Sequence, residues 1–258
     1  MMNVLITAGG TRENIDSVRS ISNHATGRLG SIIADVFAQA NSKVTYVCGE
    51  AAVLPACTDI EIIRIRSVAE LIETMETLLR QRPYDCVIHS MAVSDFTPQA
   101  IIAIDEMAET ISHSLQGEDA SQNELSDKIR AAIFQCVKPL TDKKISSNAS
   151  DVMLLLKQTP KVIERIKAIQ PHTLLVGFKL LSNVSEKELL PAGQNLLTKN
   201  TCDFVLANDL ANIENDRHKA ILMDNTGILR RANTKQEIAR MIFECVSERT
   251  ALPKEGRT

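Results

Sequence analysis

Short apolar runs alternate along the chain with longer segments in which apolar residues recur every three or four positions. Five runs are almost continuously apolar, which is typical of strands buried on both faces of a parallel sheet. These runs cover residues 3–7, 43–48, 85–90, 173–178 and 203–207. Residues 60–66 instead alternate apolar and polar side chains, so we expect this strand to lie at an edge of the sheet.

The helical segments between these runs have recognisable beginnings. Three Ser or Thr residues stand three positions before a glutamate, which is capping-box spacing: Ser67 with Glu70, Ser185 with Glu188, and Thr234 with Glu237. Thr159, directly before Pro160, predicts one more helix start. We expect the last helix to cover residues 234–248. Residues 219–223 and 228–231 flank "DNTG" and predict a late β-hairpin.

The order of elements defines the fold class. Strands that alternate with helices predict an α/β protein with a doubly wound, mostly parallel, Rossmann-like sheet. Residues 97–143 break the alternation, because they are polar and partly helical ("IDEMAETISHSL", "DKIRAAIFQCV") and show no strong core strand. We predict one domain over residues 1–258, with 97–143 as a lid or dimerisation insert.

Polar clusters follow four of the apolar runs: "AGGTRE", "SMAVSD", "GFKLLSN" and "ANDL". The carboxyl ends of parallel strands meet at one edge of a sheet, and the N-termini of the following helices face the same crevice. We therefore expect the four clusters to converge on one ligand site. Ordinary turn chemistry is the alternative explanation.

The first cluster belongs to the polar stretch "TAGGTRENIDSVRSISNHATGRLG". Gly9 and Gly10 are adjacent, so this is no G-x-G-x-x-G dinucleotide fingerprint, and we expect the next helix to begin near Ala25 or Thr26. The intervening loop carries Arg12 and Arg19, which suit an anionic substrate. Solvated surface or ion pairs within the loop explain the two arginines equally well.

Composition removes several classes of function. A formal net charge of -3 over 258 residues, with scattered basic residues, argues against a nucleic-acid partner. No apolar run approaches the length of a signal peptide or a membrane span, so we expect a cytoplasmic protein without a membrane contact. The six cysteines show no ligand spacing and are expected to be free thiols.

The motifs, taken in order, resemble the phosphopantothenate-cysteine ligase family over most of the chain. "TAGGTRENIDSVRSISNHATGRLG" matches the N-terminal signature of that family, and "AVSDF", "KIS", "TPKVI", "VGF" and "KN" before "ANDL" match its later motifs. The first motif is highly specific, and the later ones gain weight from their order. The flavin-dependent decarboxylase that many bacteria fuse to this ligase is missing, so the chain resembles the stand-alone form.

The resemblance implies an activity in coenzyme A biosynthesis. Bacterial family members join 4'-phosphopantothenate to L-cysteine with CTP and Mg²⁺, through an acyl-cytidylate that is formed as pyrophosphate leaves. It implies small-molecule partners, Mg²⁺ carried mainly by the nucleotide phosphates, and a homodimer. Animal members use ATP, so the residues alone leave CTP and ATP open.

The resemblance also implies roles for individual residues. Asn23 matches the asparagine that holds the acyl-nucleotide, and Lys144 matches the lysine needed to form it. Arg12, Arg19, Asn23 and Ala25 are the candidates for substrate binding. Nucleotide contacts are expected from the following residues: Gly9, Gly10, His89, Ser90, Met91, Asp95, Lys144, Lys157, Gln158, Thr159, Pro160, Phe178 and Lys199.

Three departures from the family pattern affect these assignments. Asn195 stands where the family has a second lysine, and "KLLSN" replaces the small residues after "VGF". The interval between Asp95 and Lys144 is longer than in the fused enzymes. Two alternatives remain: an NAD(P)-dependent reductase, favoured by Glu50 and the double glycine, and a non-catalytic nucleotide-sensing module.

Overall fold

The computed structural model describes residues 1–116, 121–140 and 151–251. Its contacts divide the chain into two compact units. The first contains Met1–Thr11, Asn23–Val93 and residues 161–251, and the second contains Arg12–Ser22 and the described part of Ser94–Pro160. The segment 97–143 lies within the second unit, and its role as a lid or dimerisation insert stays a prediction.

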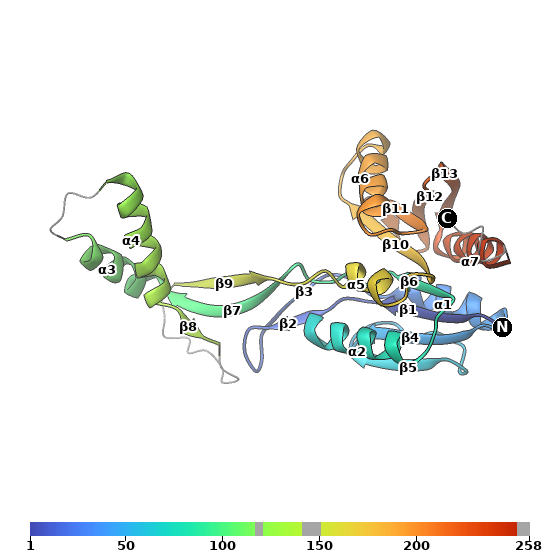
Figure 1. Cartoon of the computed structure of the whole chain (residues 1–258), viewed down its shortest axis with the longest axis horizontal. Helices are drawn as coiled ribbons and strands as arrows, with labels where there is room; N and C mark the ends of the chain where they lie inside the picture. The colour runs from blue at the N-terminus through green and yellow to red at the C-terminus, as the bar shows by residue number, and fades with distance from the viewer. Residues whose placement is uncertain (117–120, 141–150, 252–258) are drawn as a thin grey trace. The chain divides into compact units, whose positions relative to one another are not determined.

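The first unit is built on an eight-stranded sheet (Figure 1). Its strands are β1 (Asn3–Ala8), β4 (Lys43–Gly49), β5 (Glu61–Ile65), β6 (Cys86–His89), β10 (Leu174–Leu181), β11 (Phe204–Glu214), β12 (Arg217–Asp224) and β13 (Gly227–Thr234). Their order is β13-β12-β11-β10-β6-β1-β4-β5. All neighbours from β11 to β5 pair in parallel, and β12 and β13 form the antiparallel hairpin.

This order confirms the predicted doubly wound, mostly parallel sheet. β4 lies on one side of β1 and β6 on the other, so the direction of winding reverses between β1 and β6. Ligands of such sheets bind outside the carboxyl ends of the strands at this switch point. β5 lies at the edge, as its alternating pattern predicts.

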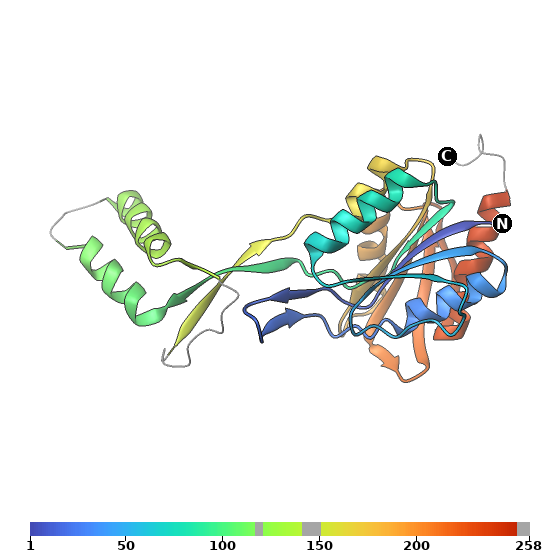
Figure 2. The ribbon, with the colours of Figure 1, turned by 90° about the horizontal axis from the view of Figure 1, so that it is seen from below.

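Helices cover both faces of the sheet (Figure 2). The helices of this unit are α1 (Arg28–Gln39), α2 (Val68–Gln81), α5 (Val162–Ile169), α6 (Glu186–Lys199) and α7 (Lys235–Ala251). α1 and α7 bury their apolar sides in one core cluster, while α2, α5 and α6 bury theirs in the other.

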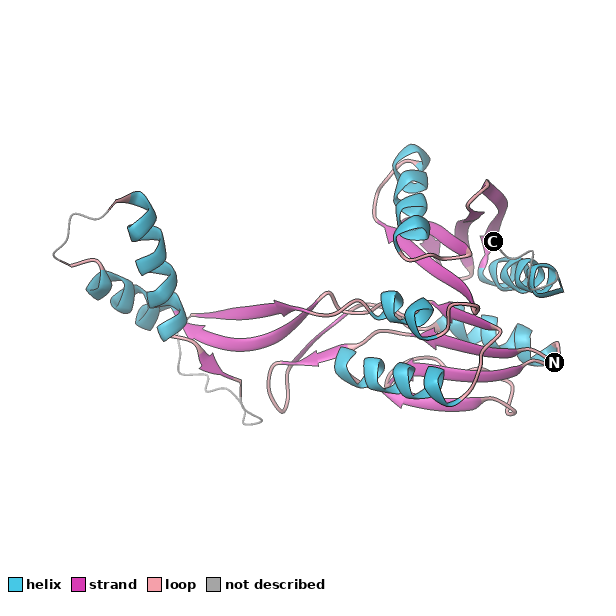
Figure 3. Cartoon of the chain, in the orientation of Figure 1, coloured by secondary structure: helices cyan, strands magenta, loops and turns pink. Residues whose placement is uncertain are grey.

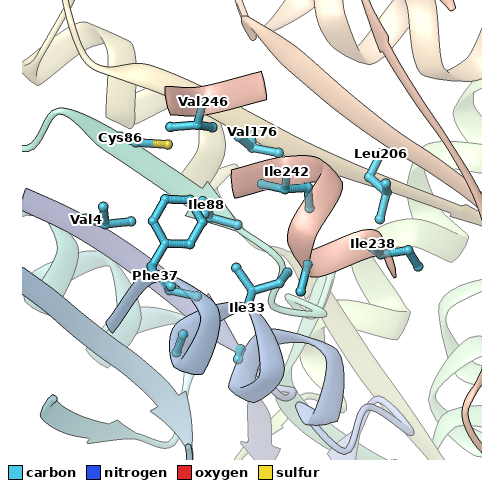
Figure 4. Close-up of a cluster of buried hydrophobic side chains, with 14 of the residues drawn as sticks. Val4, Ile33, Phe37, Cys86, Ile88, Val176, Leu206, Ile238, Ile242 and Val246 are labelled. Carbon is cyan, nitrogen blue, oxygen red and sulfur yellow. The ribbon is translucent and has the colours of Figure 1, made fainter. Parts of the chain in front are cut away.

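The core under α1 and α7 is drawn in Figure 4. Phe37 of α1 and Ile242 of α7 pack over Val4, Ile88 and other side chains of the parallel strands, and all of them are fully buried. Burial at about 25 cal/mol per Å² of apolar surface is the main force that holds helices to a sheet. The near-continuous apolar runs in the sequence reflect this burial on both faces.

Two of the predicted helix starts are wrong by two or three residues. α1 begins at Arg28 because Gly27 has a left-handed φ of 74°, which ends the preceding loop and cannot lie inside a right-handed helix. α5 begins at Val162, because Thr159 is used elsewhere: its N–H donates to Asp95 O and its hydroxyl to Ser94 O.

The capping box that starts α6 is borne out, and α2 starts at the predicted Ser67 with half of such a box, because the Glu70 carboxylate accepts from Arg66 N instead of Ser67 N. Ser67 accepts from the N–H of Glu70, and Ser185 forms the reciprocal pair with Glu188. α7 follows Thr234, whose hydroxyl accepts from Glu237 N. The Glu237 carboxylate accepts from Asn233 N.

The second unit holds strands where the sequence indicates none. Figure 3 shows its strands in magenta and its helices in cyan. The elements are β2 (Arg12–Asn14), β3 (Ser20–Ser22), β7 (Phe96–Ala103), α3 (Ile104–Ser114), α4 (Gln122–Gln135), β8 (Lys138–Pro139) and β9 (Val152–Gln158). β7 pairs antiparallel with β8 and β9, while β2 and β3 form a separate hairpin. The two predicted helical stretches correspond to α3 and α4.

All six cysteines are free thiols, as predicted. Across the described part of the chain, no helix combines the length and the apolar character that a membrane span needs.

Candidate functional site: a basic pocket at the switch point

A pocket of about 430 Å³ lies at the carboxyl ends of four parallel strands in the first unit. Gly9 follows β1, residues 90–92 follow β6, Phe178 and Leu180 come from β10, and Asn208 and Leu210 from β11. The predicted convergence of the four polar clusters is therefore confirmed. The volume is within the range of small-molecule sites.

Glycines let α1 approach the strand ends closely. A Cβ on Gly30 would lie 2.4 Å from Ala8 Cβ, and one on Gly27 would lie 3.0 Å from Gly9 N. No side chain fits there without moving backbone, so the N-terminus of α1 rests directly against β1. Gly27 gives α1 no side-chain cap, and Arg28 N makes only a long hydrogen bond of 3.4 Å to the Thr26 hydroxyl. The first turn holds no acidic residue, so its N–H groups favour an anion.

Asn23 is held beside the pocket by the loop that follows β6. Its Nδ2 donates to Ala92 O at 3.1 Å, and Ala92 N donates to Gly9 O at 2.8 Å. Ala92 and the neighbouring His24 both line the pocket. The side chain of Asn23 is exposed, so its amide lies where it can meet a ligand.

His89 lies beneath the pocket rather than in its lining. Its Nδ1 lies 2.8 Å from the Thr7 hydroxyl, and burial lowers its pKa to about 4. A neutral His89 therefore ties β6 to β1 at the switch point. The next residues of this predicted segment, Ser90 and Met91, line the pocket.

The charged lining of the pocket is entirely basic. Four of its residues are basic, namely His24, Arg28, His218 and Lys235, and no Asp or Glu lines it. Such a lining attracts anions. Burial, and then the positive charge of Lys235, lower the pKa of His218 to about 4, so this ring is neutral at pH 7. Its Nε2 lies 3.0 Å from Asn208 Nδ2.

The other predicted site residues lie in several places. Ala25 and the half-buried Phe178 line the pocket, and Gly10 pairs with Ala92 as an isolated bridge. Lys199 is exposed on α6 and pairs with Glu164 at 3.3 Å. The remaining described candidates belong to the second unit: Arg12, Arg19, Asp95, Lys157, Gln158, Thr159 and Pro160.

Within the second unit, the Arg19 guanidinium pairs with Asp16 at 2.8 Å. This is the ion pair within the loop that the sequence left as an alternative to substrate binding. Arg12 is exposed. Lys144 lies outside the described residues, and the binding role of every one of these residues stays a prediction.

Sequence reasoning missed Arg28 and Lys235. Both stand in the first turn of a helix, α1 and α7, where the helix dipole favours acidic residues. A basic residue in that position was the available signal. No sequence signal marks the pair of His218 and Asn208, because the register between β11 and β12 brings the two side chains together and the sequence does not show this register.

Metal binding has little support from the pocket itself. The lining offers no carboxylate, and no group of three or more His, Cys, Asp or Glu residues among the described ones could hold a metal ion. A Mg²⁺ ion in this pocket would need ligand oxygens, such as phosphates.

Fold and pocket together define a doubly wound α/β protein with an anion-accepting ligand site at its switch point. The chain belongs to the family described as the DNA/pantothenate metabolism flavoprotein C-terminal domain, whose model matches residues 1–116 and 129–250. The resemblance read from the sequence motifs is therefore confirmed at the level of the family.

Two curated relatives illustrate the match. The chain is 30% identical over 243 residues to the coenzyme A biosynthesis bifunctional protein CoaBC of Thermococcus kodakarensis, covering 93% of this chain and 50% of that protein. It is 26% identical to the CoaBC of Methanocaldococcus jannaschii, covering 95% and 50%. The chain thus spans about half the length of these curated relatives.

Solved structures agree. The DNA/pantothenate metabolism flavoprotein from Streptococcus pneumoniae superposes with a TM-score of 0.80 at 35% identity, covering 96% of this chain and 99% of that one. A Cab2 variant in complex with phosphopantothenate-cysteine gives a TM-score of 0.66 at 15% identity, covering 96% and 86%, which shows a shared fold.

Proposed function

We propose that this chain is a phosphopantothenate-cysteine ligase of coenzyme A biosynthesis that uses CTP. The observation that carries the proposal is the switch-point pocket, whose charged lining is entirely basic and which meets the uncapped N-terminus of α1. The names of the relatives support the same step, since they are coenzyme A biosynthesis proteins and one solved relative holds phosphopantothenate-cysteine.

The proposed reaction has two steps. The carboxylate of 4'-phosphopantothenate attacks the α-phosphate of CTP and pyrophosphate leaves, because a free carboxylate is too poor an electrophile for an amine. The amine of cysteine then attacks the acyl-cytidylate, the amide forms, and CMP leaves. Basic groups and helix N–H donors stabilise charge on the phosphates, and Mg²⁺ bound by those phosphates would add to this.

Individual residues receive roles in this proposal. Asn23 contacts the acyl group, because its amide can donate and accept and is already positioned beside the pocket. Phe178 gives the base an apolar surface. Lys144 counters charge on the phosphates and the enzyme works as a homodimer, as the family resemblance implies. Its cytoplasmic location is proposed from the apolar runs of the sequence, which are too short for a signal peptide or a membrane span.

One of the two features that favoured the reductase alternative, Glu50, has another role. Glu50, the acid that would hold a ribose, pairs with Arg66 at 2.6 Å and does not line the pocket.

The experiment that tests the proposal measures pyrophosphate release with 4'-phosphopantothenate, Mg²⁺ and either CTP or ATP, first without and then with cysteine. We expect release with CTP, and CMP and the amide product once cysteine is added. No release with either nucleotide would refute the ligase proposal.

An Asn23→Ala variant separates a ligase from a nucleotide sensor. We expect it to bind CTP like the wild type and to lose amide formation by about 100-fold, the usual cost of removing one well-placed donor. Asn225→Ala, in the exposed β12–β13 turn, is the matched control and should keep full activity. Equal rates in the two variants would remove Asn23 from the mechanism.

A further inference from the structure

Lys235 is buried to an extent that is unusual for a lysine. It is the first residue of α7, it lines the switch-point pocket, and only 9% of its surface is exposed. Lysine is almost never buried to this degree unless an opposite charge compensates for the lost hydration.

The described surroundings of Lys235 supply no such charge at contact distance. Its Nζ donates to the backbone oxygen of Asn215, and no carboxylate of the described residues lies within 4.0 Å of it. Burial lowers the pKa of Lys235; the charge of Asp216 raises it in part, and the charge of Arg28 lowers it by a smaller amount. The ammonium has three donors, and a carbonyl satisfies one of them.

A purely structural role explains this arrangement poorly. A neutral Gln could reach a carbonyl without the cost of burying a charge. The start of α7 adds a further cost, because the positive end of the helix dipole repels a cation there. Burial, the dipole and Arg28 therefore oppose the charge that Lys235 carries, and Asp216 offsets them only in part, because the pKa stays below its usual value. A bound anion would offset these costs, because it attracts the ammonium and accepts its free donors.

The same pocket offers other groups that suit a phosphate. The first turn of α1 lines it, Gly27 supplies no side-chain cap, and Arg28 stands at the start of that helix. Arg28 also has no carboxylate partner among the described residues. Helix N–H donors combined with Arg or Lys form a common phosphate site.

We propose that Lys235 binds a phosphate group of the ligand that occupies the switch-point pocket, together with the N-terminus of α1. This inference rests on the proposed function for the identity of the ligand, and it adds a residue that the family motifs do not assign. The phosphate can belong to the triphosphate of CTP or to 4'-phosphopantothenate, and the test separates the two.

The test compares wild type, Lys235→Met and Lys219→Met by isothermal titration calorimetry. Lys219 is an exposed lysine of β12 and serves as the matched control. The ligands are inorganic tripolyphosphate, CTP, cytidine, 4'-phosphopantothenate and pantothenate. Circular dichroism and thermal unfolding of each variant show whether it is folded.

We expect Lys235→Met to weaken binding of at least one phosphorylated ligand tenfold or more, and to leave binding of its unphosphorylated counterpart unchanged. Loss with CTP and tripolyphosphate assigns the triphosphate, and loss with 4'-phosphopantothenate alone assigns the substrate phosphate. Lys235→Arg, which keeps the charge, should restore part of the affinity. Lys219→Met should bind like the wild type.

Three results would overturn the inference: unchanged affinity of Lys235→Met for every phosphorylated ligand, equal losses with and without the phosphate, or no binding of any phosphorylated ligand to the wild type. If Lys235→Met does not fold, Lys235→Gln replaces it and must meet the same criteria. Tripolyphosphate keeps this test separate from the ligase proposal. A protein that binds tripolyphosphate through Lys235 but releases no pyrophosphate would refute the ligase and retain the phosphate site.

Discussion

The helix layer of α2, α5 and α6 and the switch-point pocket hold their basic side chains in different ways. In the layer of α2, α5 and α6, Lys167 pairs with Asp203 at 2.8 Å, and Glu76 pairs with both Arg80 and Arg165. In the pocket on the α1 and α7 side, neither Arg28 nor Lys235 has a carboxylate partner among the described residues. Paired charges of this kind support the fold, whereas basic groups left without carboxylates in a cavity mark where the charge of a ligand belongs.

The largest effect that this comparison predicts is on stability, at the partly buried pair of Lys167 and Asp203. Lys167→Met leaves Asp203 without its cation, although the Asp203 carboxylate still accepts from Leu175 N at 2.8 Å. Breaking this partly buried pair should cost about 2 to 3 kcal/mol, between the values for exposed and fully buried pairs, because one charge stays behind without compensation. Urea unfolding should show this loss, and titration calorimetry should show unchanged affinity for CTP.

Lys235→Met should behave in the opposite way, with a smaller loss of stability and weaker binding of a phosphorylated ligand. The contrast between the helix layer and the pocket fails if both variants change stability and affinity alike.

A smaller difference is expected between two glycines, one on each face. Gly30→Ala in α1 would bring a Cβ to 2.4 Å from Ala8 Cβ, which is held by backbone. Gly193→Ala in α6 meets the flexible end of Met223 at 2.6 Å. Both changes gain about 1 kcal/mol of helix propensity. Overpacking should nevertheless leave Gly30→Ala about 2 kcal/mol less stable than wild type, and Gly193→Ala within about 1 kcal/mol.

Thermal or urea unfolding measures both changes, and a CTP titration should show weaker binding for Gly30→Ala alone, because only Gly30 lines the pocket. Equal stability of the two variants would show that α1 does not need its close approach to β1.

The last prediction concerns the change in stability per pH unit. Burial lowers the pKa of His89 and of His218 from 6.5 to about 4, with Lys235 adding to the shift of His218. Between pH 4 and 6.5 the unfolded chain binds protons that the folded chain does not, so stability rises with pH in this window and is lost as the pH falls. Each histidine contributes a slope of up to about 1.4 kcal/mol per pH unit.

Urea unfolding at pH 4.5 to 6.5 gives the slope of the free energy of unfolding against pH. His89→Gln and His218→Gln should each remove the contribution of one histidine to this slope. Tripolyphosphate in the pocket should reduce only the contribution of His218 to this slope, because a nearby anion favours the protonated ring. If tripolyphosphate reduces the contribution of His89 to the slope by the same amount, the basic pocket is not where the anion binds.

The core of the first unit could be predicted from the sequence because burial on both faces leaves a clear pattern. The run containing Leu5 and Ile6 is continuously apolar because both faces of β1 are covered by helices. Parallel strands place their carboxyl ends at one edge of the sheet. The convergence of the four polar clusters could therefore be predicted from the strands alone, without the positions of the helices.

The strands of the second unit could not be predicted in this way. β7 and β9 pair in a three-stranded sheet that leaves Phe96, Val152 and Leu156 exposed, so no buried pattern marks them. Pro98 adds to the difficulty, because proline argues against a strand, and the β7–β9 register shifts beside it.

The site itself was predicted in part. The glycines, Ser90, Met91 and Phe178 follow directly from strand ends and motifs, and the structure places Gly9 and these three residues in the pocket lining. Lys235 lies far along the chain, and only the β12–β13 hairpin and the start of α7 bring it back to the pocket. A single sequence does not show that Lys235 lies close to the other pocket residues.

The most direct measurement of the central claim is amide hydrogen exchange of the protein with and without CTP and 4'-phosphopantothenate. The account predicts slower exchange at residues 24–30, 90–92 and 213–218, which contribute to the pocket. Slower exchange confined to α2, α5 and α6, with these segments unchanged, would contradict it.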